Sequence, residues 1–121
     1  MKVPGPDHPI TVRAHPKRVT VNFNGERIAE SDNALELREA DYPPVAYIPR
    51  ADVAMEKLVA SDHATHCPYK GEATYFSLEA GGKRVENAVW SYADPYPALA
   101  AIKGHVAFYP DRVDIVEDGT P

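Results

Sequence analysis

The sequence predicts a mainly β fold in a single domain, and three observations support this. The chain has 121 residues, which is the size of one typical domain and enough to bury a hydrophobic core without disulfides or a structural metal ion. Its 12 valines and five isoleucines favour strands over helices. Alternating apolar and polar runs come in pairs around short turns, whereas only two short segments have helical spacing.

The two ends of the chain are predicted to differ from its body. Residues 1–17 hold Pro4, Pro6, Pro9 and Pro16, so we expect an extended segment with few ladder hydrogen bonds. Residues 118–121 have the composition of a frayed end. Between them, residues 18–117 are predicted to form the β domain.

The first predicted hairpin spans residues 19–31. Val19, Val21 and Phe23 alternate with polar residues, and Asn24-Gly25 then suits a type I′ turn. Counting back from this turn places Val21 opposite Ile28. The returning strand runs from Glu26 to Ser31.

Further strands are predicted on both sides of the centre of the sequence. Leu35 and Leu37 begin one strand, the segment 41–44 interrupts it, and Val45 to Ile48 resumes extended structure. Near the end, residues 106–109 and 113–117 flank a Pro110-Asp111 turn.

Two short helices are predicted. Asp52 can cap the first, over Val53 to Ala60. Asp94 can cap the second, which Pro95 and Pro97 open and Gly104 stops; Leu99 and Ile102 are its inward pair. Because both are short, the sheets must carry the fold.

A second hairpin, of residues 72–80 and 83–92 around Gly81-Gly82, is the most informative segment for function. The diglycine turn places Leu78 opposite Val85 on an apolar face that we assign to the core. The other face pairs rings with small residues: Tyr75 with Ala88, Ala73 with Trp90, and Gly71 with Tyr92. Such pairs line a pocket or merely pack a sheet surface.

The candidate ligand-binding residues follow from this hairpin. Tyr75, Trp90 and Tyr92 would form an aromatic floor, and the run from His66 to Gly71 brings polar groups to its edge. Tyr69, Lys70, Arg50 and Glu39 would supply polar contacts, with Arg50 and Lys70 able to clamp a phosphate or carboxylate. The alternative is that Lys70–Glu39 or Arg50–Asp52 ion pairs only tie loops together.

Cys67 is the candidate catalytic residue, because it is the one thiol in the chain. A nearby ammonium such as Lys70 would favour its thiolate, whereas most free cysteines are simply buried small side chains. One cysteine cannot form an internal disulfide or a multi-thiolate zinc site, and the histidine spacing matches no closed metal motif. We therefore predict no metal and no cofactor.

The composition of the chain excludes some classes of binding partner. A net charge of −5 disfavours general nucleic-acid binding, which depends on clustered lysines and arginines. No apolar run has the roughly 18–20 residues that span a bilayer, and the first residues lack a signal-peptide core. We expect a cytoplasmic protein without nucleic-acid or membrane partners.

Several short sequence motifs together resemble those of a known family. They are Tyr42-Pro43-Pro44, Tyr47-Ile48-Pro49-Arg50, Cys67-Pro68-Tyr69-Lys70-Gly71, Trp90-Ser91-Tyr92 and Gly104-His105-Val106-Ala107-Phe108-Tyr109. Their order and spacing over residues 18–117 are similar to those of the bacterial domain-of-unknown-function family DUF427, whose members are sometimes labelled nucleotidyltransferase-like.

The resemblance implies a fold similar to the β-tent, or Mss4-like, fold: two antiparallel sheets that meet at an angle, with one or two short helices. It implies no established activity. Among proteins of similar fold, some hold zinc through paired cysteine motifs, some hold a small cyclic ligand between aromatic rings, as in the ligand-binding domain of cereblon, and methionine sulfoxide reductases of the B type use a cysteine. Fold similarity alone transfers none of these functions.

Three functions are therefore expected, in order of preference. The first is binding of a small polar, cyclic or anionic molecule in the aromatic pocket. The second is an enzyme that uses Cys67 for thiol redox or acyl-transfer chemistry. The third is a structural or interaction module, such as a homodimer formed by exposed edge strands.

Overall fold

The computed structural model describes residues 1–118, and most of its regular structure is β strand, as predicted. The ten strands are β1 (Ile10–Ala14), β2 (Arg18–Phe23), β3 (Glu26–Ser31), β4 (Leu35–Glu39), β5 (Val45–Pro49), β6 (Leu58–Cys67), β7 (Gly71–Ala80), β8 (Lys83–Ser91), β9 (His105–Phe108) and β10 (Asp114–Asp118). Three short 3₁₀ segments accompany them, namely η1 (Arg50–Asp52), η2 (Met55–Lys57) and η3 (Pro97–Ile102).

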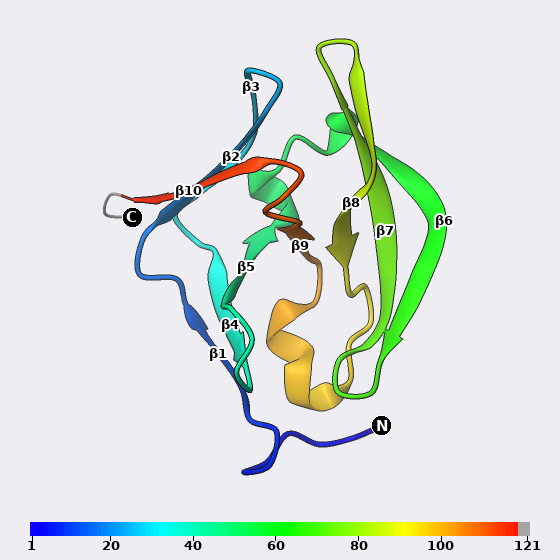
Figure 1. Ribbon diagram of the computed structural model, residues 1–121. Coiled ribbons are helices and arrows are strands. Elements are labelled where there is room, and N and C mark those ends of the chain that lie inside the picture. Colours follow the sequence, from blue (N-terminus) through cyan, green and yellow to red (C-terminus); the bar gives the residue numbers. More distant parts are fainter. Residues whose placement is uncertain (119–121) are drawn as a thin grey trace.

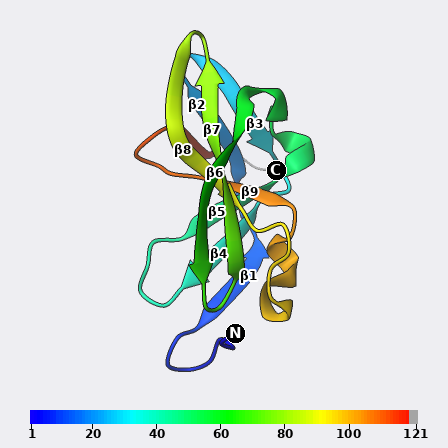
Figure 2. The same cartoon turned by 90° about the vertical axis from the view of Figure 1, so that its right-hand side faces the viewer.

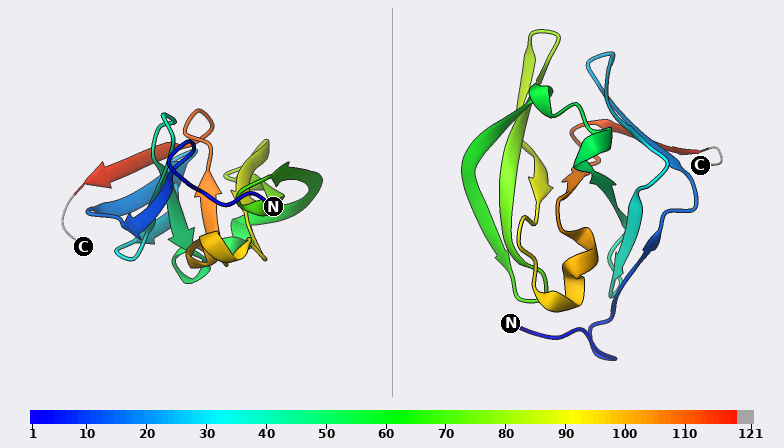
Figure 3. Two further views of the ribbon diagram at one scale, coloured as in Figure 1. Left: turned by 90° about the horizontal axis from the view of Figure 1, so that it is seen from below. Right: turned by 180° about the vertical axis from the view of Figure 1, so that it is seen from behind.

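The strands form two open antiparallel sheets, which confirms the two-sheet prediction (Figure 1). The larger sheet has seven strands in the order β1-β4-β5-β9-β8-β7-β6, and the smaller has the order β10-β2-β3. Figures 1 and 3 show β1, β4 and β5 on one side and β6, β7 and β8 on the other, with β9 and η3 between them. We call these two sides the wings of the larger sheet. The angle between sheets that defines a β-tent stays a prediction.

Neither predicted helix forms as an α-helix. Residues 53–60 instead contain the single turn η2 and the start of β6, so the helix predicted there is wrong. β6 pairs with β7 from Leu58–Leu78 to Cys67–Gly71, and this long-range pairing overrides a weak local helical preference. In the second segment, η3 follows Tyr96 rather than Asp94, and Leu99 and Ile102 are buried as predicted.

The termini also differ in part from expectation. Within the predicted extended segment, Ile10–Ala14 forms β1 and pairs with β4, a strand that the sequence pattern did not predict. Asp118 ends β10 and pairs with Arg18, whereas residues 119–121 of the predicted frayed end lie outside the described residues. No helix within residues 1–118 is long and apolar enough to cross a membrane.

The strands predicted around residues 110 and 111 both exist, but they do not pair with each other. β9 pairs with β5 and β8 in the larger sheet, and β10 pairs with β2 in the smaller sheet. The chain therefore crosses from one sheet to the other at this turn. Side chains of both sheets meet beside it.

The first hairpin forms around Asn24-Gly25, with one correction to its register. Val21 pairs with Ala29 rather than Ile28, because a bulge lies between Val21 and Asn22. The tip of this hairpin stands beside the tip of the β7–β8 hairpin (Figure 2), and Asn24 Nδ2 donates to the carbonyl oxygens of Ala80 and Gly81 at 3.0 and 3.1 Å.

The β7–β8 hairpin forms around Gly81-Gly82, and Leu78 pairs with Val85 as predicted. Beyond this pair the register changes by two residues, so Tyr75 lies opposite Trp90 rather than Ala88. Two extra β8 residues at the bulge cause the change, where Asn87 has φ of 51° and its N–H donates to Ser77 Oγ at 3.2 Å.

This change of register corrects the predicted ring-to-small pairing, in which Ala73 faced Trp90 and Gly71 faced Tyr92. The two rings of Tyr75 and Trp90 are instead direct neighbours across the ladder. A shift of two residues leaves each side chain on its predicted face, because strand side chains alternate with a period of two. The aromatic face therefore survives the correction.

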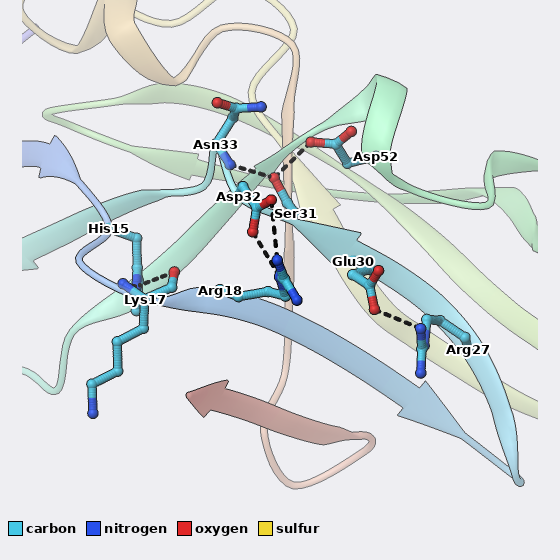
Figure 4. Close-up of polar contacts among 9 residues, drawn as sticks. All are labelled: His15, Lys17, Arg18, Arg27, Glu30, Ser31, Asp32, Asn33 and Asp52. Atoms are coloured by element: carbon cyan, nitrogen blue, oxygen red, sulfur yellow. Dashed lines mark hydrogen bonds and ion pairs between the residues drawn. The ribbon is translucent and has the colours of Figure 1, made fainter. Parts of the chain in front are cut away.

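Polar contacts attach the smaller sheet to the segment after β5 (Figure 4). Ser31 Oγ donates to Asp52 Oδ2 at 2.6 Å and accepts from the Asn33 N–H at 2.9 Å. Ala29 of β3 also bridges Val53 through the backbone. This attachment fixes β2 and β3 against the larger sheet, where they cover its core.

Two clusters of buried side chains form the interior. The aliphatic cluster lies between the two sheets and includes Val19, Val21, Ile28, Ile48, Leu78, Val89 and Val106. The aromatic cluster lies between the wings of the larger sheet and includes Leu37, Tyr47, Ala73, Tyr75, Tyr92, Leu99, Ile102 and Ala107. The candidate site belongs to the second.

Candidate functional site

A pocket of about 280 Å³ opens beside the aromatic cluster, and we call it the tyrosine pocket. Both wings of the larger sheet contribute to it, together with the loop after β4 and the residue after β9. Its lining residues are Leu37, Glu39, Tyr42, Pro43, Val45, Tyr47, Lys70, Tyr75, Trp90, Tyr92 and Tyr109. Aromatic walls with a few polar groups are typical of small-molecule sites, and the volume lies just below their ~300–1,000 Å³ range.

One corner of the pocket holds an ion pair. Lys70 Nζ donates to Glu39 Oε1 at 2.5 Å, and the other carboxylate oxygen lies 2.7 Å from His8 Nε2. The side chains of Lys70 and Glu39 are only 9% and 16% exposed. Burial alone would raise the pKa of Glu39, but the hydrogen bonds from Lys70 and His8 outweigh it and lower that pKa below its usual value. The carboxylate is therefore ionised at neutral pH and offsets the ammonium charge.

The backbone around Lys70 is fixed from its other side. The Lys70 carbonyl oxygen accepts from the Tyr96 N–H at 2.9 Å. Gly71 has φ of 111°, where an L side chain would be strained, and the chain from Asp94 to Tyr96 passes directly beside it. The turn between β6 and β7 thus holds the ammonium group in place at the pocket.

Two tyrosine hydroxyl groups have unused hydrogen-bonding capacity at this pocket. Tyr47 Oη accepts from Trp90 Nε1–H at 3.2 Å, and its own proton has no acceptor among residues 1–118. Tyr92 is only 6% exposed, yet its hydroxyl forms no hydrogen bond with any of residues 1–118. No fully buried side-chain polar atom there lacks a partner, so the Tyr92 hydroxyl must reach open space. The tyrosine pocket is the space that Tyr92 lines.

A second tyrosine pair closes another wall. Tyr75 Oη lies 3.0 Å from Thr65 Oγ1 and 3.3 Å from Tyr109 Oη. The Tyr109 and Trp90 rings have their centroids 4.5 Å apart. Burial, with the hydrogen bond to Tyr75, raises the pKa of Tyr109 to about 12. These hydroxyl groups are therefore already partnered, unlike that of Tyr92.

The protonation states follow from burial. It raises the pKa values of Tyr47 and Tyr92 well above that of an exposed tyrosine, so both phenols stay neutral over the physiological range. A neutral phenol donates one hydrogen bond and accepts others. The pocket thus presents uncharged donors next to an internally balanced ion pair.

Five of the seven predicted ligand-binding residues line this one pocket: Glu39, Lys70, Tyr75, Trp90 and Tyr92. The other two do not line it. Arg50 lies in η1 with its guanidinium 5.6 Å from the centre of the Phe76 ring, so it forms no clamp with Lys70. Tyr69 stacks on His8 with centroids 4.2 Å apart, behind the Glu39 carboxylate.

The predicted catalytic residue lies at the end of β6, next to the pocket rather than in its lining. Cys67 is partly buried, and its Sγ lies 3.5 Å from Lys70 Nζ, which donates to it. Of the ion pairs weighed from the sequence, Lys70–Glu39 forms. The ammonium thus contacts both the carboxylate and the sulfur.

A comparison with known protein families identifies the family of this chain. The model of a family described as a domain of unknown function, DUF427, matches residues 11–119. The chain belongs to the DUF427 family. No curated protein is significantly similar to it. Because the description of the DUF427 family gives no activity, the chemistry of the pocket has to carry the functional argument.

Sequence reasoning missed three aromatic residues of this DUF427 pocket, namely Tyr42, Tyr47 and Tyr109. Period-two spacing was a usable signal for Tyr47. Pairs of lining residues two positions apart come from β4 (Leu37 and Glu39), from β5 (Val45 and Tyr47), and from the end of β8 and the residue after it (Trp90 and Tyr92). Tyr42 and Tyr109 come from loop segments, where no periodicity applies.

Metal ligands do not gather in the part of this DUF427 domain that the structure describes. Within residues 1–118, no three histidine, cysteine, aspartate or glutamate side chains form a group that could hold a metal ion. His8 contacts the Glu39 carboxylate, but no third ligand joins them within residues 1–118. His63 packs against the Tyr75 ring and not against a carboxylate. The polar residues of the pocket are arranged for hydrogen bonding.

Proposed function

We propose that this DUF427 domain binds a small, uncharged, ring-shaped polar molecule in the tyrosine pocket. The observation that carries the proposal is the Tyr92 hydroxyl, which is held in a nearly buried side chain without a protein partner. Because this hydroxyl reaches the open pocket, its hydrogen-bonding capacity is free for a molecule that enters. A ligand with a hydrogen-bond acceptor supplies a partner for it.

The ion pair favours a neutral ligand over an anionic one. An anion that approached Lys70 would also approach the Glu39 carboxylate, which lies 2.5 Å from the ammonium and is held ionised. Arg50, which could have supplied a second positive charge, lies elsewhere. Lys70 still has three donor protons, of which Glu39 and Cys67 engage two, so one can meet a neutral acceptor.

The walls favour a flat ring. Trp90 and Tyr109 lie side by side with Tyr75 adjacent, so the pocket offers aromatic faces and edges. Aromatic rings pack against one another in stacked or edge-to-face geometry at centroid distances of about 4.5–7 Å. A ring with polar substituents would satisfy the hydroxyl groups while its faces contact these walls.

Nicotinamide and nicotinate provide a matched test, since they share a ring and differ in charge. Trp90 is the only tryptophan, so its indole N–H gives a single NMR signal from within the site. We expect nicotinamide to shift this signal in a saturable way, and nicotinate to bind at least several-fold more weakly. The proposal fails if neither nicotinamide nor other neutral cyclic amides, such as uracil and 2-pyrrolidone, shift it.

Variants then assign the contact. Tyr92→Phe removes one hydroxyl, and loss of a hydrogen bond of about 0.5–1.5 kcal/mol weakens nicotinamide binding by about 2- to 10-fold. Tyr69→Phe is the matched control, because it makes the same chemical change outside the pocket. Equal affinities of the two variants would remove Tyr92 from the site.

A second candidate function is thiol chemistry at Cys67, favoured by the 3.5 Å contact from Lys70. Redox or acyl-transfer chemistry would require a reactive thiolate. The measurement is the rate of alkylation by iodoacetamide as a function of pH, in the wild type and in Lys70→Met. A rate that follows an ordinary thiol titration near pH ~8.5 in both proteins would argue against catalysis.

The interaction-module hypothesis stays a prediction. β1 and β6 are the edges of the larger sheet, and β10 and β3 are the edges of the smaller one. Edge strands present unpaired backbone groups to another chain. Sedimentation over a range of concentrations measures whether a homodimer forms.

A further inference from the structure

We infer that the ligand site continues from the tyrosine pocket into a second, apolar pocket, so that its occupant is amphipathic: a polar ring that carries an uncharged apolar substituent. This inference rests on the proposed function and deepens it. The polar ring would lie in the tyrosine pocket, and the apolar substituent would lie between the two sheets.

The second pocket has a volume of about 450 Å³ and lies where the sheets face each other. Val19 and Val21 of β2 and Ile115 of β10 line it from the smaller sheet. Ile48 of β5 and Phe108 of β9 line it from the larger sheet. Aliphatic and aromatic surfaces of this kind favour a hydrocarbon group, because its burial removes apolar area from water.

The two pockets are continuous in their lining. Five residues line both of them: Tyr42, Pro43, Val45, Trp90 and Tyr109. The tyrosine pocket alone is slightly smaller than most small-molecule sites, whereas the second pocket adds a larger space next to it. One molecule can therefore contact both while it lies against Trp90 and Tyr109.

The charge of the second pocket sets the chemistry of the substituent. Glu117 is the one charged residue among its lining residues, and its carboxylate lies 3.3 Å from His15 Nε2. An ionised carboxylate on the substituent would meet this like charge and would also lose its hydration. A cationic substituent would also lose its hydration among the apolar walls, so the apolar end of the occupant should be uncharged.

A series of N-alkyl nicotinamides tests the inference: nicotinamide and its N-ethyl, N-butyl and N-hexyl derivatives. Each buried methylene should tighten binding about three- to fourfold until the apolar space is filled. The readouts are the Trp90 indole signal and intermolecular NOEs from the hexyl chain to the methyl groups of Val21 and Ile115 in the wild-type protein.

Two neighbouring residues of β10 provide the matched variants. Ile115→Trp fills the second pocket, and should abolish the gain from chain length while nicotinamide itself still binds. Val116 is 40% exposed and does not line the pocket, so Val116→Trp should keep the gain. The NOEs answer the same question if Ile115→Trp does not fold.

The outcomes separate the two proposals. If nicotinamide binds but the chain adds no affinity and no NOEs to Val21 and Ile115, the extended site is overturned and the proposed function stands. If nicotinamide and the other neutral rings fail to bind, the proposed function is overturned. Binding of the hexyl compound without any ring contribution would overturn the amphipathic occupant.

Discussion

The aliphatic cluster and the aromatic cluster are buried to a similar degree, but they differ in the polar groups that their side chains carry. Leu78, Val89 and Val106 in the aliphatic cluster are fully buried and carry no polar side-chain atoms. Tyr47 and Tyr92 in the aromatic cluster are almost as buried, yet each brings a hydroxyl group into the interior. Side chains of the first cluster need only apolar packing, whereas the second cluster leaves hydroxyl groups with free hydrogen-bonding capacity at a pocket.

This difference indicates which cluster holds the sheets together by apolar packing and which one adds polar groups for a ligand, although Val19, Val21, Ile48 and Phe108 of the aliphatic cluster also line the second pocket. An aliphatic interior is the cheaper way to hold two sheets together, since each buried polar group must find a partner. The aromatic cluster retains phenols, and the Lys70–Glu39 ion pair lies in the tyrosine pocket beside it. Substitutions in the two clusters should therefore have different signatures in stability and in ligand binding.

The largest effect on stability is expected in the aliphatic cluster. Leu78→Ala removes a side chain with no exposed surface and leaves a cavity, which should cost about 3–5 kcal/mol in the free energy of unfolding. Leu58→Ala, at a partly buried residue at the start of β6, should cost clearly less. Urea denaturation measures both. Equal losses would show that the cluster does not distinguish these positions.

Breaking the ion pair of the tyrosine pocket should come next. Glu39→Leu leaves the Lys70 ammonium nearly buried without its carboxylate, at a cost of about 3 kcal/mol. The double variant Glu39→Leu with Lys70→Met should recover at least half of that loss, because no charge is left unpaired. Arg27→Met in the exposed Arg27–Glu30 pair should change stability by less than about 1 kcal/mol. A double variant as unstable as the single one would contradict this account.

The same carboxylate predicts a dependence of stability on acid. The pKa of Glu39 is lower in the folded protein than its usual 4.5, so its contribution is present above the unfolded pKa and is lost as pH falls through the folded value. Glu39→Gln should therefore show a smaller loss of unfolding free energy between pH 6 and pH 3 than the wild type. Glu36, whose pKa is also lowered, leaves a residual slope in the variant.

The smallest effects on stability sharpen the comparison within the aromatic cluster itself. Tyr75→Phe removes contacts to Thr65 and Tyr109 and should cost about 1 kcal/mol. Tyr92→Phe removes a hydroxyl group without a partner among residues 1–118 and should change stability by less than about 0.5 kcal/mol. Thermal unfolding compares the pair. A loss in Tyr92→Phe as large as in Tyr75→Phe would mean that its hydroxyl has a structural role.

Local signals were enough to predict most strands and part of the site. The two tight turns, at Asn24-Gly25 and Gly81-Gly82, located both hairpins, and the alternation in β7 and β8 placed Tyr75 and Trp90 on one face. Lys70 and Glu39 were identified from separate segments, and their pairing was one of two alternatives. The strand pattern therefore predicted which side chains could meet.

What failed depended on distant contacts. The predicted helix over residues 53–60 gave way to pairing of β6 with β7, and the bulge at Asn87 depends on its contact with Ser77 across the ladder. The charge of Arg50 favours an anion clamp with Lys70, but the fold places its guanidinium against the Phe76 ring instead. Only tertiary packing decides such positions.

The bulge at Asn87 has a consequence for changes in chain length. Because it adds residues to β8 as a pair, Trp90 keeps its inward orientation despite the longer path from the diglycine turn. Removing one residue between Lys83 and Trp90 would exchange the two faces, so that the indole points toward the aliphatic cluster and Val89 toward the tyrosine pocket, whereas removing two would restore the alternation. Natural or engineered length variation in this hairpin should therefore be tolerated in even steps.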